Sequence, residues 1–152
     1  MRTLVGLPGV GANLQDHPIT QVTYEADRLP APGAWSLPPH VLFRSAGDAA
    51  PDLQLGFTPG MVGPGRSVAA GGYSVLVSVM APASRGSVRL RSPDPDDPPA
   101  IDPAYLTDER DVDRMLIGID RARALGAAEA LDPWRSREAR PGDLQDAAST
   151  RA

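Results

Sequence analysis

One helical pattern constrains the fold of this chain more than any other feature of its sequence. Between residues 108 and 131, apolar side chains recur every three to four positions and predict an amphipathic helix. They form a single stripe of Val112, Met115, Leu116, Ile119 and Ala122. Thr107 or Asp108 is expected to cap this helix. Gly126 is a candidate for its end or for a looser turn, and Asp132-Pro133 is expected to stop it. Because one stripe buries only one face, the rest of the chain must supply a surface for the helix to cover.

Short strands account for most of the remaining pattern. The 15 glycines and 17 prolines among 152 residues favour many turns. Alternating or continuous apolar stretches predict five strands, at residues 20–26, 41–43, 52–58, 73–81 and 87–91. The stretch 73–81 is rich in Val and Leu, so we expect it at the centre of the sheet. The turn at Ser84-Arg85-Gly86 is expected to join the last two strands as a hairpin.

Three stretches lack either periodicity and are predicted to be loops, at residues 27–39, 60–72 and 92–103. The segment 136–152 has few apolar anchors and is predicted to be a frayed tail. The sequence therefore predicts one α+β domain over residues 1–135. Its antiparallel β-sheet is expected to be packed on one face by a long C-terminal helix.

Charge and composition argue against several classes of function. The net charge of −4 and the lack of a basic tract argue against nucleic-acid binding. Without cysteine there is no disulfide, zinc-thiolate site or thiol catalysis, and we expect no metal site. The acidic run Asp94–Pro99 is interpreted as a solvated loop rather than a calcium site. The longest apolar runs are too short to span a membrane and no signal peptide is recognisable, so we expect a cytoplasmic protein with no membrane partner.

The few chemically distinctive residues lie near the start of the chain. Gly9-x-Gly11 resembles half of a dinucleotide-binding fingerprint but is better interpreted as a turn, because no third glycine follows. His17 stands beside Asp16, a neighbour that would hold the imidazole in one tautomer, as a general base requires. The same Asp-His-Pro turn is equally compatible with a structural hydrogen-bonded knot, so both interpretations stay open. His40 is expected at the surface or at a sheet edge rather than as a ligand.

Five blocks of sequence, taken together, resemble one known family. Residues 7–18 (LPGVGANLQDHP) are similar to the LPGVGxNLQDHP segment of the glucose-methanol-choline (GMC) oxidoreductases. Residues 84–92 resemble the family's SRGxVxLxS hairpin, and residues 98–106 its PPxIDPxYL segment. Residues 51–57 are similar to the family's PDLQLxF strand, and residues 108–131 to its following helix. The order of the blocks is the family order, and the resemblance covers nearly the whole chain.

The resemblance implies a substrate-binding domain, in which an antiparallel sheet backed by helices covers the reactive face of FAD. It suggests Asn13, Asp16 and His17 as cofactor-binding residues. The sequence matches neither the family's glycine fingerprint nor the HPxGTCRMG-like block that carries the catalytic histidine. We therefore expect that this chain alone neither binds FAD nor oxidises alcohols. The family also has a longer stretch between Pro18 and Pro51, and a polar residue at the position of Gly56.

Two functions follow as hypotheses. In the first, the chain is the substrate-binding portion of a GMC-type oxidoreductase, with FAD-dependent alcohol oxidation completed by a partner chain. In the second, it is a cofactor-free pocket protein that binds an apolar small molecule, or acts on it as a cyclase or isomerase. The expected substrate-binding face carries Leu53, Leu55, Phe57, Val77, Val79 and Met80. Because the helix covers one face only, we expect a homodimer or a bound ligand centred on Leu53, Leu55 and Phe57.

Overall fold

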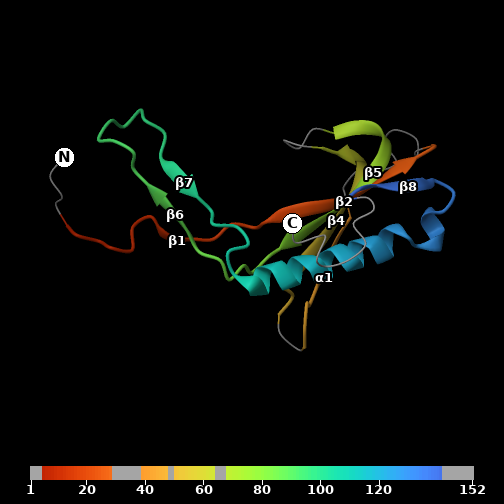
Figure 1. Cartoon of the computed structure of the whole chain (residues 1–152), viewed down its shortest axis with the longest axis horizontal. Helices are drawn as coiled ribbons and strands as arrows, with labels where there is room; N and C mark the ends of the chain where they lie inside the picture. Colours follow the sequence, from red (N-terminus) through yellow and green to blue (C-terminus); the bar gives the residue numbers. More distant parts are fainter. Residues whose placement is uncertain (1–4, 29–38, 48–49, 64–67, 142–152) are drawn as a thin grey trace.

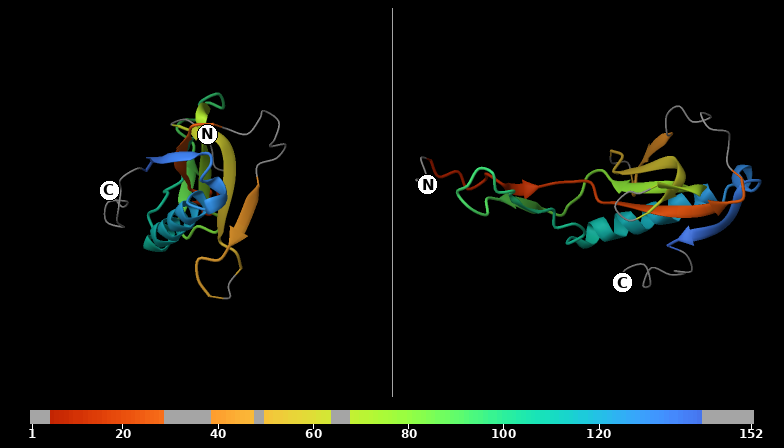
Figure 2. Two further views of the ribbon diagram at one scale, coloured as in Figure 1. Left: turned by 90° about the vertical axis from the view of Figure 1, so that its right-hand side faces the viewer. Right: turned by 90° about the horizontal axis from the view of Figure 1, so that it is seen from above.

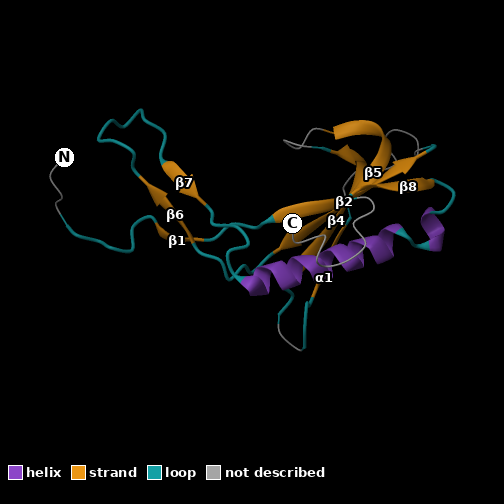
Figure 3. Ribbon diagram, in the orientation of Figure 1, coloured by secondary structure: helices purple, strands orange, loops and turns teal. Residues whose placement is uncertain are grey.

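The computed structural model describes residues 5–28, 39–47, 50–63 and 68–141. Their strands are β1 (Ala12–Leu14), β2 (Ile19–Ala26), β3 (His40–Phe43), β4 (Leu53–Val62), β5 (Val68–Val79), β6 (Gly86–Arg89), β7 (Ala100–Asp102) and β8 (Arg135–Arg140). The helices are α1 (Glu109–Gly126) and the short 3-10 helix η2 (Glu129–Leu131). The strands pair antiparallel in two sheets, ordered β3-β4-β5-β2-β8 and β1-β6-β7 (Figures 1 and 3).

Two regions can be distinguished. The five-stranded sheet with α1 and η2 forms the body, which comprises residues 17–84 and 108–141 as far as they are described. The three-stranded sheet and its loops form the arm, residues 5–16 and 85–107. Figure 1 shows the arm extending from one end of the body. The predicted α+β class is confirmed, with α1 lying along one face of the larger sheet (Figure 2).

The core of the body lies between α1 and the sheet. Met115, Ile119 and Ala122 of the predicted stripe are buried against apolar side chains of β2, β4 and β5. Gly118 allows this close approach, because a Cβ atom there would lie 2.3 Å from Cγ1 of Val77. Tyr73 stacks between Phe57 and Tyr24 with ring centroids 5.1 Å apart in both pairs. Burial raises the pKa of Tyr24 to about 12.

The cap of α1 is Asp108, one of the two candidates, and its carboxylate accepts the N–H of Arg110 at 3.0 Å. The helix ends at Gly126, the earlier of its two predicted ends, and η2 follows before Asp132. Beyond it, residues 135–140 form β8, which pairs with β2, so the predicted fraying does not apply to residues 136–140. Residues 142–152 of the predicted tail lie outside the described residues. No helix in the described part of the chain is long and apolar enough to cross a membrane.

Two of the predicted loops contain strands. Much of the glycine-rich stretch 60–72 extends β4 and β5 into one long hairpin, and the predicted loop 92–103 contains β7. A bulge near Gly60, whose φ is +100°, interrupts the register of β4 with β5. These stretches have no side-chain pattern typical of a strand. They form strands all the same, because backbone hydrogen bonds between paired strands do not depend on the type of side chain.

The predicted hairpin of 73–81 with 87–91 is wrong. β6 does not pair with β5 but lies in the arm, between β1 and β7. The reason is Asp111, a fully buried carboxylate on α1. It accepts the main-chain N–H groups of Ala83 and Ser84 at 2.8 and 2.7 Å, and the Ser84 hydroxyl at 2.7 Å. These bonds hold the expected turn against the start of the helix, so the chain leaves the body there instead of folding back.

Candidate functional site

The two faces of the five-stranded sheet differ in chemistry. Residues opposite each other in an antiparallel pair share a face, and successive residues alternate between faces. One face, covered by α1, is apolar. The other, which α1 does not cover, is mostly polar. Its side chains come from four neighbouring strands: Ile19, Gln21, Thr23, Glu25, His40, Leu42, Gln54, Thr58, Ser74, Leu76 and Ser78.

Part of this helix-free face is closed by the end of the β4–β5 hairpin. The Ser74 hydroxyl donates to the carbonyl of Gly60 at 3.1 Å and accepts the N–H of Val62 at 2.9 Å. Thr23 is also fully buried, with Oγ1 3.1 Å from Oγ of Ser74. Ser78 is nearly buried, and its hydroxyl has no hydrogen-bond partner among the described residues. The helix-free face is therefore a polar surface, and the β4–β5 hairpin covers the part of it around Ser74 and Thr23.

The exposed part of the helix-free face carries an ordered polar pair from β3 and β4. Gln54 Nε2 lies 2.7 Å from Nδ1 of His40. The His40 ring lies over the backbone of Gly56, the residue opposite it in the register, so that a Cβ there would be 2.9 Å from Cε1. His40 stands on the edge strand, as the sequence predicted. The contact between His40 and Gln54 was not predicted from the sequence. Alternation along β4 could have indicated only that Gln54 lies on the other face of the sheet from Leu53 and Leu55.

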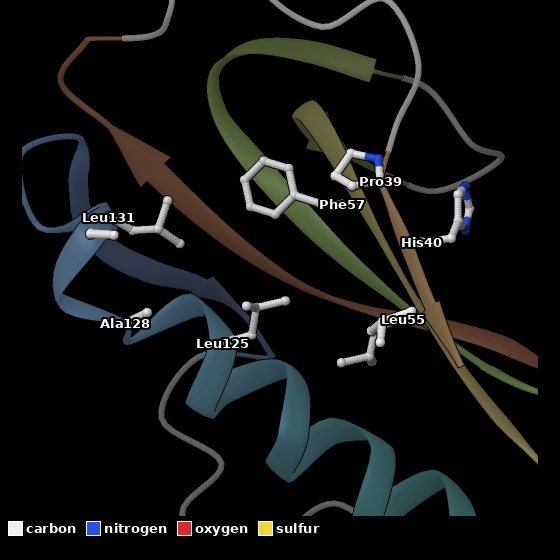
Figure 4. Close-up of a pocket in the computed structure, with 9 residues that line it drawn as sticks. Pro39, His40, Leu55, Phe57, Leu125, Ala128 and Leu131 are labelled. Carbon is white, nitrogen blue, oxygen red and sulfur yellow. The ribbon is translucent and has the colours of Figure 1, made fainter. Parts of the chain in front are cut away.

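An apolar pocket of about 390 Å³ lies on the other side of the sheet, between the β3–β4 edge and the end of α1. Its lining consists of Pro39, His40, Val41, Leu55, Phe57, Leu125, Ala128, Ala130 and Leu131. Figure 4 shows Leu55 and Leu125 directed toward the space between sheet and helix, whereas the His40 imidazole points away from it. Such a volume is typical of small-molecule pockets. Its lining can bind an apolar ligand but offers almost nothing to polarise a reacting bond.

The predicted substrate-binding residues lie mainly on the helix-covered face. Leu53, Val77 and Val79 are fully buried beneath α1, and Leu55 is nearly so. The expectation that Leu53, Leu55 and Phe57 lie on a face without cover is therefore wrong. α1 packs on that same face, because the sheet presents its larger apolar side chains there. Leu55 and Phe57 reach the pocket; Met80 lies just beyond the end of β5 and is half-buried.

The predicted cofactor-binding residues lie together where the arm meets the body. Asn13 and His17 are exposed, and Asn13 has a φ of +59°. The Asp16 carboxylate accepts the Tyr105 hydroxyl, and accepts the main-chain N–H of His17 at 2.9 Å. These two hydrogen bonds, that of Tyr105 foremost, lower the pKa of Asp16. Asp16 thus binds the backbone of His17 rather than its imidazole, which favours the structural interpretation of this turn.

The junction of arm and body is held by charged groups. Arg114 Nη1 lies 3.2 Å from Asp111 and Arg114 Nε lies 3.1 Å from Asp52. Burial alone would raise the pKa of Asp111, but hydrogen bonds from Ala83 and Ser84 and the charge of Arg114 lower it overall. The same balance lowers the pKa of Asp52, with Ser45 as its main hydrogen-bond donor. Periodicity could not reveal this junction, because Asp111 occupies an ordinary first-turn position in the helix.

The arm exposes most of the large apolar side chains that the described chain leaves in solvent. Leu90 is 78% exposed and Ile101 is 61% exposed. The remaining exposed members on the arm are Val5, Leu7, Val10, Tyr105 and Leu106. The arm has no helix of its own to cover these side chains (Figure 3). Such a concentration of apolar surface is characteristic of an interface.

In comparisons with known proteins, this chain is similar to oxidoreductases. The family model described as GMC oxidoreductase matches residues 82–152. Choline oxidase from Arthrobacter globiformis is 35% identical over 93% of this chain, which covers 28% of that protein. Alcohol dehydrogenase (acceptor) from Pseudomonas putida is 34% identical over 90% of this chain, which covers 30% of that protein. The chain therefore spans less than a third of the length of these relatives.

Solved structures give the same result. Pyridoxine 4-oxidase from Mesorbium loti matches 97% of this chain with a TM-score of 0.80 and 30% identity, and the chain covers 30% of it. An FAD-dependent oxidoreductase from Chaetomium thermophilum matches 95% of this chain with a TM-score of 0.64. At 21% identity the second match supports the fold alone. Both the body and the arm fall within the first match, so the arrangement of two sheets is shared.

Proposed function

The chain is homologous to the C-terminal, substrate-binding domain of the GMC oxidoreductases, and from this premise we propose that it forms the substrate half of a flavin-dependent alcohol oxidoreductase. The observation that carries the proposal is the match to pyridoxine 4-oxidase over 97% of the chain. Choline oxidase and an alcohol dehydrogenase among the relatives support an alcohol as the substrate. Choline and pyridoxine are therefore the two alcohols to test first.

In this proposal the arm is the surface that meets the flavin-binding part. The chain covers only 28–30% of its relatives, so the flavin-binding part corresponds to the remainder of their length. Each large apolar side chain is stabilised by about 1.5–3 kcal/mol when fully buried. Burial of Leu90 and Ile101, both well exposed, would therefore drive the association. The helix-free polar face of the body would then face the reacting alcohol.

Asn13 and His17 fit one wall of a flavin site. Both are exposed at the junction, and Asp16 is engaged by Tyr105 and by the His17 N–H. Because both side chains are exposed, a second surface has to supply the other wall of a flavin site. When bound, FAD supplies the two-electron oxidation of the alcohol. The residues of this chain hold and orient the substrate and keep water from the sheet face.

A chimera tests the proposal. The corresponding part of pyridoxine 4-oxidase is replaced by this chain, and the purified protein is examined for flavin absorbance and for turnover of pyridoxine and choline. We expect retained flavin and turnover of at least one alcohol, and loss of flavin when Leu90 and Ile101 are both changed to Asp. Arg121→Gln, on the exposed side of α1, serves as the control. A folded chimera without flavin, or one unaffected by the double change in the arm, would contradict the proposal.

The apolar pocket supports a second candidate, a cofactor-free protein that binds an apolar small molecule. Its volume of about 390 Å³ and its carbon lining suit such a ligand. The purified chain is titrated with a fluorescent apolar probe, with Phe57→Ala as the pocket variant. Saturable binding that Phe57→Ala weakens, in a chain that takes up no FAD, would favour this candidate. Sedimentation equilibrium in the same samples distinguishes ligand binding from a homodimer, the third possible cover for the apolar surface.

A further inference from the structure

The helix-free face carries one imidazole in a defined place. The ring of His40 occupies the space above Gly56 that any other residue would fill, since a Cβ at Gly56 would lie 2.9 Å from Cε1 and 3.0 Å from Nδ1. His40 and Gly56 are direct partners in the β3–β4 register. Gly56 is buried, although Gln54 on the same face of β4 is partly exposed to solvent. The ring is thus held close to the sheet rather than extended into solvent.

Gln54 determines which nitrogen of that ring carries the proton. Its Nε2 lies 2.7 Å from Nδ1 of His40. An amide nitrogen can only donate a hydrogen bond, so Nδ1 must accept. In the neutral ring the proton is then on Nε2, which has no hydrogen-bond partner among the described residues. Position and tautomer together leave one N–H donor available on the exposed part of the polar face.

We propose that the His40–Gln54 pair, seated over Gly56, is a substrate-orienting site whose Nε2–H donates to an acceptor atom of the alcohol other than the hydroxyl being oxidised. This inference rests on the proposed function and specifies its substrate class. It selects alcohols that carry a second hydrogen-bond acceptor on a ring or side group. Pyridoxine has such acceptors in its ring nitrogen and ring hydroxyl. Choline has none, because its other end is a trimethylammonium group.

The tautomer is tested in the chain as it stands. Nitrogen NMR of the two imidazoles, His17 and His40, distinguishes the Nε2–H form from the Nδ1–H form. We expect the Nε2–H form at His40, and a shift toward a mixture in Gln54→Leu, while the His17 signal stays unchanged as the internal reference. Addition of pyridoxine should shift the His40 Nε2 signal, and choline at the same concentration should not. An Nδ1–H form in the wild type, or no difference between the two alcohols, overturns the proposal.

Substrate preference is tested in the chimera with pyridoxine 4-oxidase. Loss of one hydrogen bond in His40→Leu should raise the KM for pyridoxine about tenfold and change that for choline by less than about twofold. Gly56→Ala places a methyl group where the His40 ring now lies and should push the ring away from the sheet. It should therefore also raise the KM for pyridoxine but not that for choline, with Arg121→Gln as the control. A chimera that loses its flavin speaks against the proposed function. One that keeps its flavin but shows the same preference in all variants speaks against the role of His40.

Discussion

The body and the arm both contain an antiparallel sheet, but the body buries its large apolar side chains and the arm exposes them. Leu53 in the body is completely buried beneath α1, whereas Leu90 in the arm is 78% exposed. The arm strands are three or four residues long and no helix packs on them, so they cannot enclose a core. The body therefore carries the stability of the chain, whereas the arm leaves its large apolar side chains in solvent.

The largest effect is expected in the core of the body. Leu53→Ala removes a fully buried side chain between the sheet and α1, and should lower the free energy of unfolding by about 2–5 kcal/mol. Denaturant unfolding of the purified chain measures this loss. Leu42→Ala on the neighbouring strand, more than half exposed, is the control and should stay within about 0.5 kcal/mol. Similar losses in both variants would show that the core does not carry the body's stability.

The junction should show the next effect. Asp111→Ala leaves the N–H groups of Ala83 and Ser84 without their acceptor, which should cost about 2–4 kcal/mol in the free energy of unfolding. It should also loosen the arm, so that limited proteolysis cuts between residues 81 and 86 sooner than in the wild type. Glu109→Ala on the exposed side of the same helical turn is the control. Unchanged proteolysis in Asp111→Ala would contradict this role.

The same carboxylates predict acid sensitivity. The pKa values of Asp111 and Asp52 are lower in the folded chain than the ordinary value of 3.8. The unfolded chain therefore takes up protons first as the pH falls, and stability is present above the unfolded value and lost below it. The midpoint temperature of thermal unfolding should therefore not depend on these two groups near neutral pH, and it should fall as the pH drops below about 4. Asp111→Ala should show a shallower fall, and an equally steep one would exclude Asp111 as a cause.

A smaller effect is expected where α1 approaches the sheet. Gly118→Ala gains about 1 kcal/mol of helix propensity but places a methyl group against Val77, and such overpacking costs about 1–3 kcal/mol. The net result should be a loss of about 1 kcal/mol in the free energy of unfolding. Arg121→Ala in the same helix but exposed should be close to neutral. A stabilised Gly118→Ala would show that the helix can move away from the sheet at little cost.

The smallest effect belongs to the arm. Leu90→Ser should change the free energy of unfolding of the isolated chain by less than about 0.5 kcal/mol, because the side chain is already in solvent. In the chimera the same substitution should measurably weaken the retention of flavin. A loss in the isolated chain comparable to that of Leu53→Ala would mean that the arm already buries its apolar side chains in the chain alone.

The elements that the sequence predicted well are those with a strong local pattern. The stripe of Met115, Ile119 and Ala122 placed α1, and alternation around Leu53 and Leu55 placed β4. The role of the residues on each face could not be predicted in this way, because alternation shows which residues share a face but not which face the helix covers. Leu53, Val77 and Val79 were therefore interpreted as a ligand surface, although they form the core.

By itself, the sequence determined the α+β class, the residues that share a face of β2 and of β4, and the position of the helix, because side-chain periodicity is a local property. Only the tertiary structure decided that β6 leaves the body for the arm, and that His40 lies over Gly56 beside Gln54. Both depend on contacts between residues distant in the chain, such as Ser84 with Asp111. Local patterns carry no record of such contacts, since their free energy arises only when the elements have packed together.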